Sequence, residues 1–174
     1  MAKTVIRNIL RLVFLVLLQA LVVNRLQLLD GMMFPMVYLF GLLMLPFNTP
    51  KWMLMIVAFL VGLTMDGFSD TPGFHASAAL LMTFVQPLVQ KILAPREGYE
   101  FGQKPTIQSM GLVWYVLFAG ILVLIHHLWY FYLEVFRFDN FFHTLGKAAL
   151  SGIGTLVLLV LGQFLIYTQK PRSA

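Results

Sequence analysis

The sequence predicts an all-α, polytopic integral membrane protein with six transmembrane helices, forming a single domain over residues 1–174. Three observations predict this fold class. Apolar residue types make up 60% of the chain and charged types only 11%, whereas a soluble domain carries roughly a quarter charged residues. The mean hydropathy is +0.85. Apolar stretches recur along the whole chain, so we expect the bilayer to act as solvent for most of it.

The six expected helices follow the apolar stretches in order. They are Ile6–Val23, Met32–Leu45, Trp52–Phe68, His75–Ala94, Met110–Leu133 and Leu145–Tyr167. A hydrocarbon core of about 30 Å needs roughly 20 helical residues. The second and third stretches are shorter than this, so we expect them either to use flanking residues or to lie off the full thickness of the membrane.

The basic residues predict the orientation of these helices. With six spans and a cytoplasmic N-terminus, nine of the twelve Lys and Arg residues face the cytoplasm and three face outward. The cytoplasmic set is Lys3, Arg7, Arg11, Lys51, Lys91, Arg96, Lys104, Lys170 and Arg172, and the outer set is Arg25, Arg137 and Lys147. Because cytoplasmic loops are enriched in Lys and Arg, we expect both termini in the cytoplasm.

Composition also excludes several function classes. The net charge of +5 could indicate a nucleic-acid-binding protein, but the basic residues are spread thinly beside apolar runs and are better explained as topology signals. We therefore expect membrane lipid around the chain and no nucleic-acid partner. The chain has no cysteine, so it can form no disulfide, thiolate metal site or thiol nucleophile.

The most informative segment joins the third and fourth expected helices. There Asp66 lies near the outer end of a helix that is interrupted by Thr71, Pro72 and Gly73. An acid inside a membrane is costly unless it is wet or partnered. One interpretation is a carboxylate pair of Asp66 and Asp70, as an intramembrane aspartyl hydrolase requires. A second is that backbone or hydroxyl donors, such as that of Ser69, satisfy Asp66 and fix the turn. A third is a partner-binding role for this outer surface.

No residue pattern predicts catalysis or a cofactor. His126 and His127 are adjacent, so they point about 100° apart on a helix and lack the i,i+4 spacing of a metal pair. With Trp129, Tyr130 and Tyr132 they are typical of an interfacial aromatic belt. A metal site combining them with His75 and His143 is conceivable, but no spacing demands it. We therefore expect no enzyme activity, no catalytic residue, no cofactor and no metal.

The sixth expected helix begins with small residues. Ala148 and Gly152 are four apart, as are Ser151 and Thr155, and this spacing allows close helix approach with hydroxyl hydrogen bonds. The face could pack within the bundle or against a partner's transmembrane helix.

Three segments resemble the family of rod shape-determining protein MreD. The first is Gly62-Leu63-x-x-Asp66 followed by Ser69-x-Thr71-Pro72-Gly73-x-His75-Ala76; the others are the hairpin LPFNTPKW at 45–52 and LAPREGY at 93–99. The resemblance also includes the basic first helix, the length and the span count. Its family signature is expected to form a structural turn from Gly62, Asp66, Pro72, Gly73 and His75.

The resemblance implies a non-enzymatic scaffold in the bacterial inner membrane that acts in peptidoglycan synthesis and cell-shape control. Such a protein binds MreC directly and helps to connect the MreB cytoskeleton to the glycosyltransferase and transpeptidase of the elongation complex. The MreD family is also similar in fold to the S components that bind substrate for vitamin transporters. The alternative function is therefore a small-molecule-binding subunit of a transporter, with its pocket near Asp66, His75 and the loop after the fifth expected helix.

Overall fold

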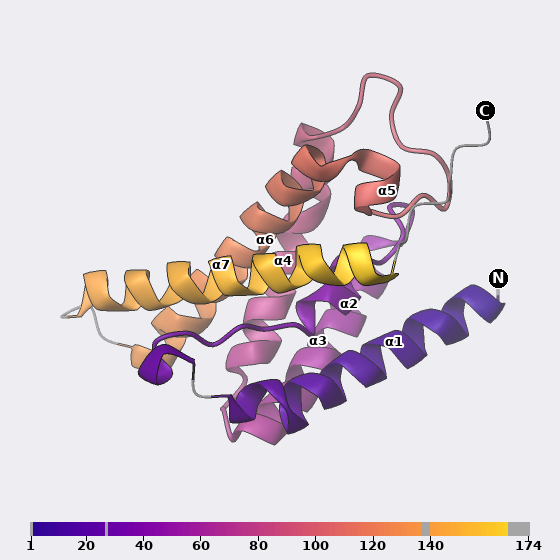
Figure 1. Cartoon of the computed structure of the whole chain (residues 1–174). Coiled ribbons are helices and arrows are strands. Elements are labelled where there is room, and N and C mark those ends of the chain that lie inside the picture. The colour runs from indigo at the N-terminus through magenta and orange to yellow at the C-terminus, as the bar shows by residue number, and fades with distance from the viewer. Residues whose placement is uncertain (1, 27, 137–139, 167–174) are drawn as a thin grey trace.

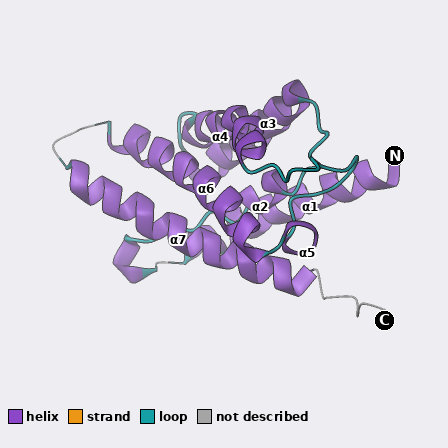
Figure 2. Cartoon of the chain, turned by 90° about the horizontal axis from the view of Figure 1, so that it is seen from above, coloured by secondary structure: helices purple, strands orange, loops and turns teal. Residues whose placement is uncertain are grey.

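The computed structural model describes residues 2–26, 28–136 and 140–166 of the chain, and every regular element in these ranges is a helix (Figure 1). Among the long helices, α3 (Lys51–Ser69) packs beside α4 (Phe74–Ile92), and α6 (Leu112–Val135) packs beside α7 (Phe141–Ile166) (Figure 2). Short elements separate some of them. In chain order the helices are α1 (Ala2–Leu21), η1 (Val23–Arg25), η2 (Leu29–Gly31), α2 (Leu39–Leu43), α3 (Lys51–Ser69), α4 (Phe74–Ile92), α5 (Ile107–Met110), α6 (Leu112–Val135) and α7 (Phe141–Ile166).

Within the described residues, four segments are long and apolar enough to cross a membrane. They are Val5–Arg25, Lys51–Ser69, Leu112–Val135 and Phe141–Ile166. Helix α4 has 19 residues, but Gln86, Gln90 and Lys91 make it less apolar than these. Large hydrophobic side chains are exposed along all four segments, as expected where lipid replaces water. The chain is therefore a helical membrane protein.

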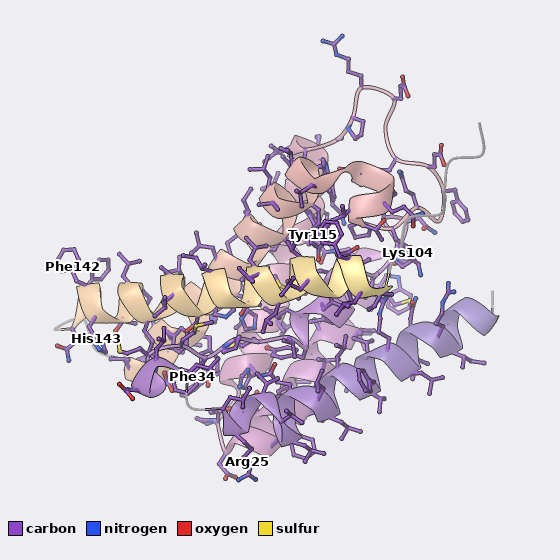
Figure 3. All side chains as sticks on the ribbon, viewed as in Figure 1. Arg25, Phe34, Lys104, Tyr115, Phe142 and His143 are labelled. Atoms are coloured by element: carbon purple, nitrogen blue, oxygen red, sulfur yellow. The ribbon has the colours of Figure 1, made fainter. Side chains whose placement is uncertain are left out.

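The ends of the long helices gather at two ends of the molecule. At one end, Phe47 N–H donates to the Gln103 carbonyl at 3.0 Å, and Ile107 N–H donates to Gln163 near the end of α7. At the other, Asn24 donates to Ser69 at 3.2 Å. Figure 3 shows Lys104 at the first end and His143 at the second. Across the described residues the chain runs six times between these ends, through α1, residues 28–45, α3, α4, α6 and α7.

Five of the six expected helices are confirmed to within a few residues at most boundaries, as α1, α3, α4, α6 and α7. Tyr167, the expected last residue of the sixth, lies outside the described residues. The second expectation is wrong as a continuous helix over 32–45, because only Leu39–Leu43 is α-helical and residues 34–36 have no regular structure. Pro35 explains part of this difference, since proline lacks an N–H and clashes with the preceding helical turn.

Residues 28–45, the second of the six runs, are called the second pass below. Side chains from two other helices form hydrogen bonds with the backbone groups of this pass that no helix pairs. Ser151 and Thr155 of α7 accept hydrogen bonds from the N–H groups of Phe34 and Met36, at 3.0 and 2.9 Å. Gln19 of α1 accepts from Val37 N–H at 2.6 Å and donates to the Pro35 carbonyl at 3.0 Å. Non-helical backbone at membrane depth is tolerated only where protein or water satisfies it. These three side chains therefore allow an unwound segment to lie inside the bundle.

Thr155 gives a direct test of that arrangement. The variant Thr155→Val keeps the shape of the side chain but leaves Met36 N–H without its acceptor, so we expect a loss of about 2 kcal/mol in unfolding free energy. Thr155→Ser keeps the hydroxyl and should lose much less. Titration of the purified variants with denaturing detergent measures both, and equal stability of Val and Ser variants would contradict this role for the hydroxyl.

Candidate functional site

Asp66 forms the centre of the turn between α3 and α4. Its Oδ1 accepts hydrogen bonds from Thr71 Oγ1 at 2.5 Å and from His75 N–H at 2.9 Å, and its Oδ2 accepts from Ala76 N–H at 2.9 Å. The two N–H groups belong to the first turn of α4, which has no intrahelical acceptors for them. A negative charge is also favoured at this positive end of a helix. Asp66 therefore caps α4 from the neighbouring helix.

Gly62 lies one turn before Asp66 and permits this contact. A Cβ atom at residue 62 would lie 2.5 Å from Ala76 Cα and 2.7 Å from Ala76 N. Both neighbours are backbone atoms that cannot rotate away. The absence of a side chain at Gly62 therefore lets α3 approach the first turn of α4 closely enough for Asp66 to reach it.

The chain reverses between these helices through two left-handed residues. Asp70 ends α3 at φ 51° and Gly73 precedes α4 at φ +86°, a region that glycine occupies without steric cost. Pro72 is exposed between them. The five residues of the expected structural turn are therefore neighbours along the connection: Gly62 and Asp66 lie in α3, Pro72 and Gly73 between the helices, and His75 in α4.

The satisfied-acid interpretation of Asp66 is confirmed, although Thr71 supplies the hydroxyl donor and Ser69 instead bonds to Asn24. The carboxylate-pair interpretation is not supported, since Asp66 is 4% exposed with donors on both oxygens. Asp70 is exposed, and no hydrogen bond joins the two acids within the described residues. A shared proton between them has no place in this geometry.

A group of buried aromatic side chains, joined by hydrogen bonds, lies behind the turn. Tyr38, from the second pass, places its hydroxyl 3.3 Å from His75 Nδ1 and 2.8 Å from His126 Nε2. His127 contacts the Val123 carbonyl through Nδ1 and Thr155 through Nε2, at 2.9 and 3.1 Å. The expected interfacial belt is therefore wrong for both histidines, which are fully buried among α4, α6, α7 and the second pass.

A metal site from four histidines is also not formed by the described residues. No group of three or more His, Asp or Glu side chains in these ranges is arranged to hold a metal ion. His143 is exposed at the start of α7 (Figure 3). The buried histidines instead bond to a hydroxyl or a carbonyl.

The small-residue face of α7 is buried inside the chain. Ala148, Ser151 and Thr155 are each 0% exposed, Gly152 is also buried, and the two hydroxyls bond to the second pass. The interpretation of this face as a docking surface for a partner helix is therefore wrong, because the chain itself already occupies it.

A cavity of about 420 Å³ opens beside the turn, at the end of the molecule that contains Arg25. His75 and Tyr130 form part of its lining, with their ring centroids 4.5 Å apart. Phe34 and Phe131 add aromatic walls, and Lys147 lies 4.8 Å from the centroid of each of these two rings. Lys147 also pairs with Glu134 at 3.0 Å. The cavity thus combines aromatic walls with several polar groups, as ligand sites do.

Comparison with known proteins adds no assignment: no family description, no curated protein and no solved structure matches the chain. The resemblance to the MreD family is therefore carried by the motif residues alone. Sequence reasoning missed Tyr38 and the burial of His126. A signal existed for His126, because the buried residues of α6 recur at helical spacing through Tyr115, Leu122 and His126.

Proposed function

We propose that the chain is a non-enzymatic scaffold of the bacterial cell-elongation complex, similar to MreD, that binds MreC in the inner membrane. The observation that carries this proposal is the cap that Asp66 places on α4. It gives Gly62, Asp66, Gly73 and His75 of the MreD-like signature a structural role in one turn, and it engages both oxygens of Asp66 in hydrogen bonds. A turn whose acid is already hydrogen-bonded supports the binding of a partner protein better than it supports catalysis.

The proposal includes six membrane crossings with both termini in the cytoplasm, in a bundle like that of S components. Arg7, Arg11 and Lys104 support this orientation, because they lie near one another at the end opposite Arg25 (Figure 3). Lys51 agrees with it, because it begins α3, whose other end at Ser69 bonds to Asn24. Burial lowers the pKa of Lys104, and the neighbouring charges of Arg7 and Arg11 lower it further. Of the other residues used for orientation, Arg137, Lys170 and Arg172 lie outside the described residues, and Lys3 has no described side chain.

The proposed surface for MreC is the outer turn. Leu63 is 49% exposed there, and together with Gly67, Asp70 and Pro72 it lines a shallow hollow. MreC would bring its transmembrane helix, or the first residues that follow it, against this hollow. MreB and the elongation glycosyltransferase and transpeptidase would join through MreC and the wider complex.

In-cell photo-crosslinking tests this proposal. A photoreactive amino acid at Leu63 should capture MreC, whereas the same amino acid at Trp52, exposed at the opposite end, should not. Affinity purification and mass spectrometry identify the captured protein, with the elongation synthases expected as further partners. Recovery of transporter ATPase subunits without MreC would contradict the scaffold function.

The cavity favours a second candidate function, a small-molecule-binding subunit similar to an S component. Its volume of about 420 Å³ lies within the range of about 300–1,000 Å³ typical of ligand sites. It opens at the proposed outer end beside His75, where an extracellular ligand could enter.

A further inference from the structure

His75 presents one ring nitrogen to the cavity. Its Nδ1 faces the Tyr38 hydroxyl, and its ring packs on Tyr130. The remaining nitrogen, Nε2, has no hydrogen-bond partner among the described residues. It is not one of the fully buried polar atoms without a partner, and His75 lines the cavity. The protonation of this atom decides whether the cavity offers a ligand a hydrogen-bond donor or an acceptor.

The hydrogen bonds of Tyr38 with His75 and His126 constrain that protonation. Tyr38 bridges His75 and His126, and its single hydroxyl proton can be donated to only one of the two rings. His126 is 0% exposed, and its Nδ1 is buried without a partner in the described part of the chain. A ligand therefore cannot reach His126, and His75 Nε2 is the ring nitrogen of this pair that is available to a ligand in the cavity.

Two arrangements of protons are possible for neutral rings. If Tyr38 donates to His126, then His126 carries its proton on Nδ1 and buries an N–H with no acceptor. If Tyr38 donates to His75 Nδ1, then His126 Nε2–H donates to Tyr38. Nδ1 of His126 then carries no proton, and only an acceptor lone pair is left without a partner. Orphaned buried N–H groups are rarer in proteins than under-satisfied acceptors, so the second arrangement is favoured. It places a proton on His75 Nε2.

We propose that the cavity binds a neutral aromatic molecule through a hydrogen-bond acceptor that faces His75 Nε2–H, with Tyr38 and His126 as positioning residues. The inference rests on the second candidate function. Phe34, Phe131 and Tyr130 supply aromatic surface. A neutral ligand follows from the charges, since Glu134 is paired with Lys147, and Arg25 and Asp70 at the cavity carry opposite charges.

Quinoline and indole form a matched pair of probes. Both are neutral two-ring molecules, but quinoline offers one nitrogen acceptor and indole one N–H donor. Fluorinated forms of each, titrated against the full chain in detergent and followed by fluorine NMR, give two dissociation constants. We expect quinoline to bind about tenfold or more tightly than indole, because indole would set its N–H against that of His75. The variant His75→Phe should abolish this preference, and His143→Phe is the matched control at an exposed histidine.

Tyr38→Phe tests the positioning role. It removes the bridging hydroxyl while keeping the ring, so nitrogen NMR of labelled histidine should show His75 losing its Nε2–H preference, and the quinoline preference should fall to about threefold or less. An unchanged preference in Tyr38→Phe would overturn that role. Equal binding of both probes to the wild-type chain, or tighter binding of indole, would overturn the inference and leave the second function intact. If neither probe binds, the inference and the cavity's ligand function both fail.

Discussion

Replacing Asp66 with alanine is expected to destabilise the protein by about 3 kcal/mol. The substitution removes the acceptor for two buried N–H groups of α4 and for the Thr71 hydroxyl. Buried donors left without partners cost roughly 1–3 kcal/mol each, and loss of a helix cap alone costs about 0.5–2 kcal/mol. Detergent-denaturation titration of the purified chain, followed by circular dichroism, measures the loss.

Two variants control this experiment. Asp66→Asn keeps one oxygen acceptor, so we expect a loss between that of the alanine variant and the wild type. Asp70→Asn should change stability by less than about 0.5 kcal/mol, since Asp70 is exposed. If Asp66→Ala were as stable as Asp70→Asn, Asp66 could not be the cap of α4.

Replacing Gly62 with alanine is expected to cost about 3 kcal/mol, the upper part of the usual range for overpacking. The added methyl group would overlap Ala76 Cα, Ala76 N and the His75 carbonyl oxygen, all within 2.7 Å. Helix α3 must then move away from α4, and the hydrogen bonds of Asp66 lengthen with it. The same denaturation titration reports this loss.

Gly67 provides the matched control on the same helix. It is exposed, and a Cβ there would meet nothing within 4 Å. Gly67→Ala should therefore leave stability unchanged or raise it by up to about 1 kcal/mol through helix propensity. Equal destabilisation by the two substitutions would mean that close approach at Gly62 does not shape the turn.

Hydropathy and turn residues predicted the long helices and the turn at Asp66 because both signals are local. Apolar runs of helical length predict α3 and α4, and Pro72 and Gly73 mark the turn between them. An acid in a membrane needs hydrogen-bond donors wherever it lies. The identity of those donors could not be read from the sequence. Thr71 and the first turn of α4 meet Asp66 only because Gly62 brings the two helices together.

The second pass was not predictable in the same way. An apolar stretch such as Met32–Leu45 has the same hydropathy whether it is helical or extended, and Pro35 was the only local warning. The residues that stabilise the unwound form are distant in sequence, with Gln19 on α1 and Ser151 and Thr155 on α7. Small polar residues on a membrane helix usually indicate helix packing. Here they replace the hydrogen bonds that a helix would have made itself.

Cysteine labelling across the second pass tests the central proposal, that residues 28–45 cross the membrane although most of them are not helical. The chain has no cysteine of its own, so single substitutions report one site each. In whole cells, a membrane-impermeant maleimide should label Asp30→Cys from outside and should label Lys51→Cys only after the membrane is opened. Both residues are exposed. Labelling of both from the same side would show that the second pass does not cross, and would contradict the account.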